Sequence, residues 1–133
     1  MGTLLGFDFG PRKIGVAVGQ TITASASPLT TVRSRDQKPD WKRIEDLVLE
    51  WKPNVAIVGL PFNMDDTEAQ FAPHARRFAR QLRGRFGLEV HLVDERLTSI
   101  DARRRLGRKA TSLEIVDAMA ATLILETWLS ERH

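Results

Sequence analysis

The stretch LLGFDFGPRKIGVAVG, at residues 4–19, decides the fold of this chain. Residues 4–9 form a short apolar run, which is typical of a buried strand. Residues 10–13 begin with glycine and proline and continue with two basic residues, which indicates a turn. Residues 14–19 are again apolar and small, so they read as a second strand. The stretch therefore predicts a β-hairpin with a basic tip.

One acidic residue stands inside the first of these strands. Because strand side chains alternate between two faces, Asp8 points away from the side shared by Phe7 and Phe9. An ionised carboxylate on a buried strand is costly unless it is paired or binds a metal ion. Asp8 is therefore a candidate site residue. The alternative is a strand-end carboxylate that only caps the Gly10 turn.

Beyond the hairpin, extended and helical patterns alternate along the chain. The expected segments are, in order, a strand at 24–32, a polar loop at 34–39, a helix at 40–51, a strand at 55–58, a helix at 67–86, a strand at 88–93, a short basic helix at 98–106 and a helix at 111–130. An early antiparallel hairpin followed by this alternation predicts an α/β fold, in which helices pack on a mixed sheet. The length of 133 residues fits one domain, spanning 1–133.

The positive charge of the chain is unevenly distributed. The whole chain has 20 Lys and Arg against 17 Asp and Glu, a net charge of +3. Residues 71–110 alone have eleven basic and four acidic residues, or +7, which leaves −4 for the remainder. Fifteen of the basic residues are Arg, which binds phosphate in a bidentate manner that Lys cannot match. A phosphate-containing partner is one interpretation, and a solvated helix face is the other.

Composition also excludes several classes of protein. The chain has no Cys, so disulfides and thiolate metal sites are absent, and its three scattered His argue against a zinc site. The first residues lack the basic segment of a signal peptide. The longest apolar run, at 118–125, is far shorter than the ~20 residues that span a bilayer. We expect a cytoplasmic protein with no membrane association.

Two further acidic positions stand in apolar settings. Asp117 lies in the last predicted helix, where three of its four neighbours one turn away are apolar or small. Asp94 and Glu95 follow an apolar strand, and only one of them can share a face with Asp8. Periodicity does not choose between the two. The alternative for Asp117 is a carboxylate paired with an Arg, and the alternative for Asp94 and Glu95 is a helix cap or a loop salt bridge.

Taken together, these carboxylates suggest one site at an edge of the sheet. They come from the first strand, from a later strand end and from the last helix. Oxygen ligands without His or Cys suit Mg²⁺ or Mn²⁺. Two such ions can activate a water and stabilise the leaving oxygen of a phosphodiester. A phosphate-containing substrate would also suit the Arg-rich segment.

Several motifs resemble one known family. They are FDFG at 7–10, KIGVAVG at 13–19, VGLP at 58–61 with NMD at 63–65 and TE at 67–68, DERLT at 94–98, and VDA at 116–118. In this order they are similar to the YqgF (RuvX) family, whose members are described as pre-16S rRNA nucleases and as Holliday junction resolvases. The resemblance covers nearly the whole chain.

The resemblance implies a ribonuclease H-like fold with a five-stranded mixed sheet flanked by helices. It places the acidic triad of the family on Asp8, Glu95 and Asp117, and so favours Glu95 over Asp94. These residues would be both catalytic and metal-binding, with two Mg²⁺ or Mn²⁺ ions. The implied activity is Mg-dependent hydrolysis of phosphodiester bonds by water, in processing the 5′ end of pre-16S rRNA. The implied partners are pre-rRNA, ribosomal precursor particles and possibly branched DNA.

Further residues are expected to bind the substrate near the triad. They are Gly10, Lys13, Asn63, Thr67, Arg96, Arg104 and Arg105. The sequence departs from the family pattern in two places: Asp66 replaces a usual Gly, and the segment at 106–111 is short. Asp is among the residues least penalised where a Gly with positive φ is usual. The short segment is either a true deletion, which would affect the grip on the substrate, or a place where residues of a basic loop are omitted.

Three other functions are compatible with parts of the sequence. A resolvase-like DNA endonuclease would use the same acidic triad. A non-catalytic RNA-binding assembly factor would need the Arg-rich face but not the acids. An ATP-binding module would use the DFG motif and the basic hairpin, but such proteins need two domains of this kind.

Overall fold

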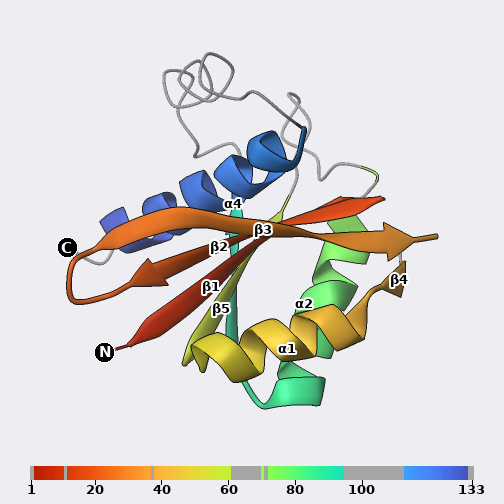
Figure 1. The fold of residues 1–133 in the computed structure, drawn as a ribbon, viewed down its shortest axis with the longest axis horizontal. Coiled ribbons are helices and arrows are strands. Elements are labelled where there is room, and N and C mark those ends of the chain that lie inside the picture. The colour runs from red at the N-terminus through yellow and green to blue at the C-terminus, as the bar shows by residue number, and fades with distance from the viewer. Residues whose placement is uncertain are drawn as a thin grey trace.

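The computed structural model shows one six-stranded sheet with helices on both faces (Figure 1). The structure describes residues 2–10, 12–36, 38–60, 70, 72–94 and 113–131, with side chains in the last segment from 118 onward. Its elements are β1 (Thr3–Phe9), β2 (Lys13–Gln20), β3 (Ser25–Arg35), β4 (Lys38–Pro39), α1 (Trp41–Trp51), β5 (Val55–Leu60), α2 (Ala72–Phe86), β6 (Glu89–Asp94) and α4 (Leu113–Ser130). None of the described helices is long and apolar enough to cross a membrane.

The sheet mixes antiparallel and parallel pairs in the order β4-β3-β2-β1-β5-β6. β1, β2 and β3 are successively antiparallel, whereas β5 pairs parallel with both β1 and β6. The C-terminal ends of β1, β5 and β6 therefore meet at one edge of the sheet. The start of β2 and the end of β3 lie at the same edge, because their partners run in the opposite direction. The carboxyl-terminal edge of parallel strands is the usual place for a ligand site in α/β folds.

Two hydrophobic cores lie on the two faces of the sheet, as strand alternation requires. One core joins the sheet to α1 and α2, and the other joins it to α4. Figure 1 shows α1 and α2 together on one side and α4 on the other. We call these sides the α1/α2 face and the α4 face. On β1, Leu5, Phe7 and Phe9 belong to the first core, and Leu4 belongs to the second.

Helix α1 begins and ends at residues that the sequence indicated. The side chain of Asp40 accepts a hydrogen bond from the backbone N–H of Arg43 at 3.2 Å, which makes Asp40 the N-cap. The helix ends at Lys52, which has a left-handed backbone with φ of 47° and donates its N–H to the carbonyl of Val48. Proline follows at position 53, where the helix cannot continue.

The hairpin and the described parts of the alternating pattern are confirmed, with strand and helix ends that differ by a few residues. The polar loop expected at 34–39 is wrong. Ser34 and Arg35 extend β3, and Lys38 and Pro39 form β4, the sixth strand of a sheet for which five were expected. The cause is alternation, because Ser34 is buried at 7% exposure beside Val32 at 1%. The short helix expected at 98–106 and the helix start expected at 67 lie outside the described residues.

Candidate active site

Asp8 lies near the C-terminal end of β1, on the α4 face of the sheet. It is in phase with Leu4 and Gly6 and out of phase with Phe7 and Phe9, which belong to the core of the other face. The side chain is half-buried rather than exposed. The alternation expected from the sequence is therefore confirmed.

The neighbours of Asp8 across the sheet are glycines. Gly15 of β2 is its register partner, and Thr31 of β3 is the partner of Gly15. On the other side, Phe7 pairs with Val58, so the next pair along these parallel strands joins Asp8 to Gly59. Residues paired in register share a face of the sheet. Asp8 is thus flanked on its own face by two positions without side chains.

Helix α4 crosses this face antiparallel to β1. A Cβ built at Gly6 would lie 2.5 Å from the Cγ of Leu125 and 3.1 Å from the carbonyl oxygen of Ala121. A Cβ built at Gly19, which pairs with Leu4, would instead meet Leu125 and Leu129. Later residues of β1 therefore lie beside earlier residues of α4, so the two elements run in opposite directions. The close approach depends on glycine, since a larger residue at position 6 would overlap the helix.

Asp94, the last residue of β6, lies on the opposite face from Asp8. Val93 belongs to the core of the α4 face, whereas Val90 belongs to the core of the α1/α2 face. Asp94 alternates with Val93 and is in phase with Val90, so it belongs on the α1/α2 side. The sequence left open which of Asp94 and Glu95 accompanies Asp8. The alternation of β6 places Asp94 on the α1/α2 face, so Asp94 does not share the face of Asp8.

Two of the expected substrate-binding residues lie at the hairpin tip. The N–H of Gly10 donates to the carbonyl of Lys13 at 3.0 Å, and a Cβ at Gly10 would stand 2.7 Å from that oxygen. Gly10 is thus required by the turn itself. Lys13 is two residues from Gly15 on β2, so it shares the α4 face with Asp8 and lies about one strand spacing to the side.

Two arginines on β3 extend this basic edge and were missed by the sequence analysis. Arg33 is the register partner of Lys13, and Arg35 follows two residues later on the same face. Both are exposed, whereas Val32 and Ser34, which alternate with them, are buried on the other face. The signal was present in the sequence, as an alternation of basic and buried residues from 32 to 35. The polar composition of this segment concealed it.

Most of the remaining expected site residues lie outside the part of the chain that the structure describes. Asp117 lies in α4, but its side chain is outside the described part of that helix. Within the described residues, no three His, Cys, Asp or Glu gather closely enough to hold a metal ion. The expected residues that lie outside the described ranges altogether are Glu95, Asn63, Thr67, Arg96, Arg104 and Arg105, together with the family departures at Asp66 and 106–111.

Comparisons with solved structures concern the fold. Thermus thermophilus RuvC in complex with a Holliday junction substrate aligns with a TM-score of 0.58 and 17% identity, over 99% of this chain and 96% of that one. The Holliday junction resolvase of fowlpox virus aligns with a TM-score of 0.57 and 12% identity, over 98% of this chain and 99% of that one. At these identities the likeness shows the shared architecture. It confirms the mixed α/β, ribonuclease H-like fold.

Comparisons of sequence are much closer. A protein of Nitrosococcus oceani named "Putative pre-16S rRNA nuclease" is 51% identical, over 98% of this chain and 88% of its own length. A protein of Yersinia pestis with the same name is 48% identical, over 98% of this chain and 96% of its own length. The model of the RuvX family, described as Holliday junction resolvase, matches residues 2–131. The chain therefore belongs to the RuvX family.

Proposed function

We propose that this chain is a nuclease that hydrolyses phosphodiester bonds of precursor 16S rRNA, with Asp8, Glu95 and Asp117 as its acidic site. The position of Asp8 carries the proposal. It is a half-buried carboxylate on the α4 face, at the edge where three parallel strands end, between two glycines. The names of the relatives in Nitrosococcus oceani and Yersinia pestis support the substrate.

The geometry of α4 supports the inclusion of Asp117. The helix passes Gly6 at Ala121, and Asp117 stands four residues earlier in the helix. Four helical residues rise about 6 Å, and two strand residues advance about 6.6 Å. Because α4 is antiparallel to β1, the backbone of Asp117 falls level with Asp8, two residues beyond Gly6.

The phase of β6 supports the inclusion of Glu95. Val93 lies on the α4 face, and Glu95 is two residues further along the chain. A strand that keeps its alternation returns to the same face at every second residue. In the sheet order, β6 is separated from β1 only by β5, whose neighbouring residue on this face is Gly59. A carboxylate at position 95 would therefore approach Asp8 across a position without a side chain.

The three carboxylates fit divalent cations of the magnesium type. Carboxylate oxygens without His or Cys suit Mg²⁺ or Mn²⁺ rather than zinc, and the residues beside Asp8 in the sheet, Gly15 and Gly59, have no side chains. Asp8, Glu95 and Asp117 would hold the ions. Bound there, such ions supply charge stabilisation for phosphodiester hydrolysis.

The basic residues of the same face would hold the substrate. Lys13 and Arg33 are register partners. They lie two residues from the paired Asp8 and Gly15, toward the sheet edge where β1 ends. Both side chains share the face of Asp8, where they could bind a phosphate next to the acidic group. The arginine offers a bidentate contact to phosphate oxygens. In this arrangement Lys13 and Arg33 would orient the nucleic acid strand, and the bond that is cleaved would lie next to Asp8.

The test compares one substitution in the site with the same change elsewhere. Asp8→Asn removes a charge and keeps the size of the side chain, whereas Asp46→Asn makes the identical change on the surface of α1. We expect Asp8→Asn to reduce Mg²⁺-dependent cleavage of a pre-16S rRNA fragment by at least about 100-fold, as for loss of an essential charged group. Asp46→Asn should cleave at the parental rate.

The outcomes separate the candidate functions. Cleavage by Asp8→Asn at the parental rate would refute the site. A four-way DNA junction is run beside the RNA, because the structural neighbours include resolvases bound to or named for that substrate. Cleavage of the junction but not of the RNA, lost on Asp8→Asn, would keep the site and replace the substrate. Cleavage of neither substrate by the parent protein would refute the nuclease assignment.

A further inference from the structure

A second basic site lies where β4 and the start of α1 meet α2. A cavity of about 290 Å³ opens there. The described residues that line it include three cationic side chains and one acidic side chain, and are Asp36, Lys38, Pro39, Trp41, Arg77, Gln81 and Arg85. Since α2 covers the α1/α2 face, its two arginines are on the other side of the sheet from Asp8. The cleavage site does not account for these charges.

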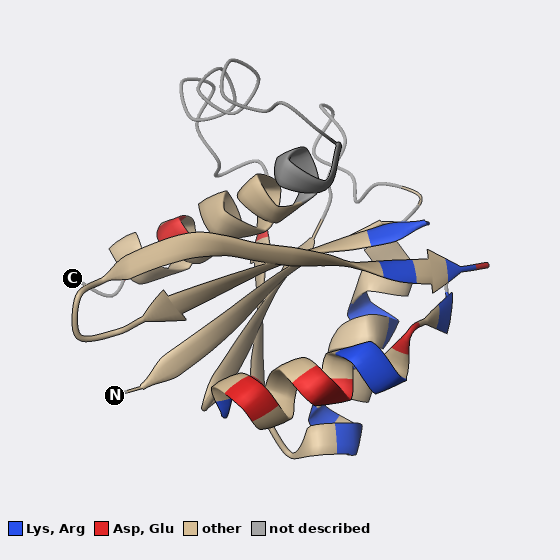
Figure 2. Cartoon of the chain, viewed as in Figure 1, with Lys and Arg blue, Asp and Glu red and all other residues tan. Residues whose placement is uncertain are grey.

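Structural contacts connect this cavity to the edge that carries Asp8. Lys13 is the register partner of Arg33, and Arg35 is the register partner of Lys38. Lys38 in turn lines the cavity together with Arg77 and Arg85. Figure 2 shows basic segments at the start of β2, near the end of β3 and along α2. The positive charge therefore continues from one face of the sheet, around β3 and β4, to the other.

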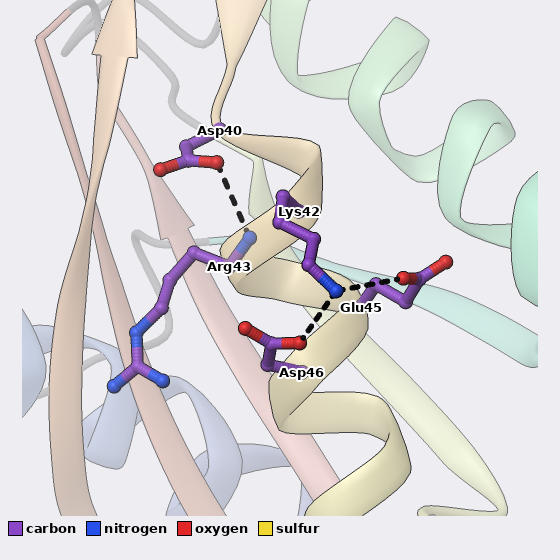
Figure 3. A network of polar contacts seen from close by, with 5 residues as sticks. All are labelled: Asp40, Lys42, Arg43, Glu45 and Asp46. Atoms are coloured by element: carbon purple, nitrogen blue, oxygen red, sulfur yellow. Dashed lines mark hydrogen bonds and ion pairs between the residues drawn. The ribbon is translucent and has the colours of Figure 1, made fainter.

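Three acidic residues at the start of α1 have partners within their own helix. Glu45 and Asp46 both contact the ammonium group of Lys42, at 3.5 and 3.2 Å, and Asp40 caps the helix through the N–H of Arg43 (Figure 3). These carboxylates are thus engaged within their own helix. Among the described residues that line the cavity, Asp36 is the one carboxylate, against three cations.

An aromatic side chain fixes one of the cations. The guanidinium carbon of Arg85 lies 4.2 Å from the ring centroid of Trp41, and that ring stacks on Phe78 at 5.5 Å. Phe78 is buried at 1% exposure, so the arrangement rests on the core. Stacking uses the flat face of the guanidinium, whereas its N–H donors lie in the plane. Arg85 is therefore held in place in a way that suits binding of a phosphate oxygen.

We propose that these residues form a continuous track for the backbone of a nucleic acid strand, leading from Asp8 around the sheet edge into the cavity. The basic track consists of Lys13, Arg33, Arg35, Lys38, Arg77 and Arg85. This proposal extends the proposed function, because the strand that it holds is the one cut at Asp8. The phosphate groups of the strand would be its ligands, without contacts that read the base sequence.

The length of the track defines the substrate that needs it. Lys38 is three strands from Asp8 and four residues further along β3. With strands about 4.8 Å apart and about 3.3 Å per residue, the separation is on the order of 20 Å. At about 3.4 Å per nucleotide in a stacked strand, this corresponds to about six nucleotides. A shorter substrate would reach Asp8 without entering the cavity.

The experiment measures binding and does not require cleavage. The Asp8→Asn protein is titrated with fluorescein-labelled single-stranded RNA of about 24 and about 4 nucleotides at several salt concentrations, because phosphate contacts give affinity a defined salt dependence. In this background, Arg77→Ala is compared with Arg80→Ala, an exposed arginine one turn further along α2 that does not line the cavity. Both variants lose the same charge from the same helix.

The proposal predicts different results for the two variants. Arg77→Ala should reduce the slope of log K against log salt by about 0.7 for the long RNA, which is the value for one lost contact to a single strand. Its affinity at low salt should fall several-fold. Arg80→Ala should bind the long RNA as the parent does, and neither change should affect the short RNA. Equal losses for both variants, or no loss for Arg77→Ala, would overturn the track.

Two further outcomes distinguish this proposal from others. If Arg77→Ala weakens binding to vesicles that contain phosphatidylserine but not binding to RNA, the cavity serves a lipid surface and the proposal is wrong. If the RNA results are as expected but the parent protein cleaves no RNA or DNA, the track remains as a binding surface and the nuclease assignment fails. If cleavage depends on Asp8 while Arg77→Ala binds normally, only the track fails.

Discussion

The contact between Gly6 and α4 offers a direct test of how the fold positions the site. In Gly6→Ala, the added methyl group would stand 2.5 Å from the Cγ of Leu125 and 3.1 Å from the carbonyl oxygen of Ala121. Carbon atoms in contact prefer about 3.5–4.0 Å, so the helix and the strand must separate by about 1 Å. Overpacking of this kind costs about 1–3 kcal/mol.

The matched control is another glycine replaced by alanine. A Cβ at Gly84, inside α2, would meet no atom within 4 Å, and this glycine does not have a positive φ. Gly84→Ala should therefore stabilise the protein by about 0.5–1 kcal/mol, because glycine is unfavourable inside a helix. Thermal unfolding followed by circular dichroism measures both variants. With about 3–4 °C per kcal/mol for a chain of this size, Gly6→Ala should unfold about 3–12 °C lower than the parent, and Gly84→Ala slightly higher.

The same substitution also tests the link between helix position and function. Displacing α4 from β1 moves Asp117 relative to Asp8, and a misplacement of about 1 Å can lower an enzymatic rate by about 100-fold. We expect Gly6→Ala to lose most of its nuclease activity at a temperature where it is fully folded. An unfolding midpoint equal to that of the parent would refute the steric reasoning. Lower stability with full activity would show that the spacing of β1 and α4 does not control the site.

Two further predictions concern the polar contacts of α1. Asp40→Ala should lower the free energy of unfolding in urea by about 0.5–2 kcal/mol because it removes the N-cap, and Asp40→Ser should restore most of it; equal stability of the two variants would contradict the capping role. The hydrogen bond and charge of Asp46, together with the charge of Glu45, raise the pKa of Lys42 above its ordinary value of 10.5. This pairing therefore stabilises the fold at neutral pH, and that stabilisation is lost as the pH rises through the raised pKa. Asp46→Asn should lower the pKa of Lys42, measured by NMR titration of its ammonium group, more than Glu45→Gln does, and the reverse order would be contrary to the geometry.

The local features of the fold could be predicted because they depend on neighbouring residues. Alternation placed Asp8 on the opposite face from Phe7 and Phe9, and the structure confirms this. The N-cap at Asp40 and the helix end before Pro53 follow from the chemistry of single residues. The extension of β3 was missed because Arg33 and its neighbours are polar in composition, although their alternation is that of a strand.

The assembly of the site could not be predicted from local pattern. Strand pairing is non-local, and the sequence alone does not state that β5 lies between β1 and β6 or that α4 runs antiparallel to β1. The choice between Asp94 and Glu95 depended on the family resemblance for the same reason. The choice required knowing which residues of β6 face which core. Val90 and Val93 show this, because they belong to the cores on opposite faces of the sheet.

The distribution of charge shows why the two faces of the sheet have different tasks. The sequence of α4 from 113 to 130 contains no Lys or Arg, so this helix adds acid to the face of Asp8 without adding a cation. Among the described residues, the cations come instead from the start of β2, from the end of β3 and from α2. Lys13 and Arg33 lie on the same face as Asp8, whereas the arginines of α2 lie on the opposite face. A basic edge that joins the two faces would let a polyanion that passes Asp8 continue around the sheet to α2.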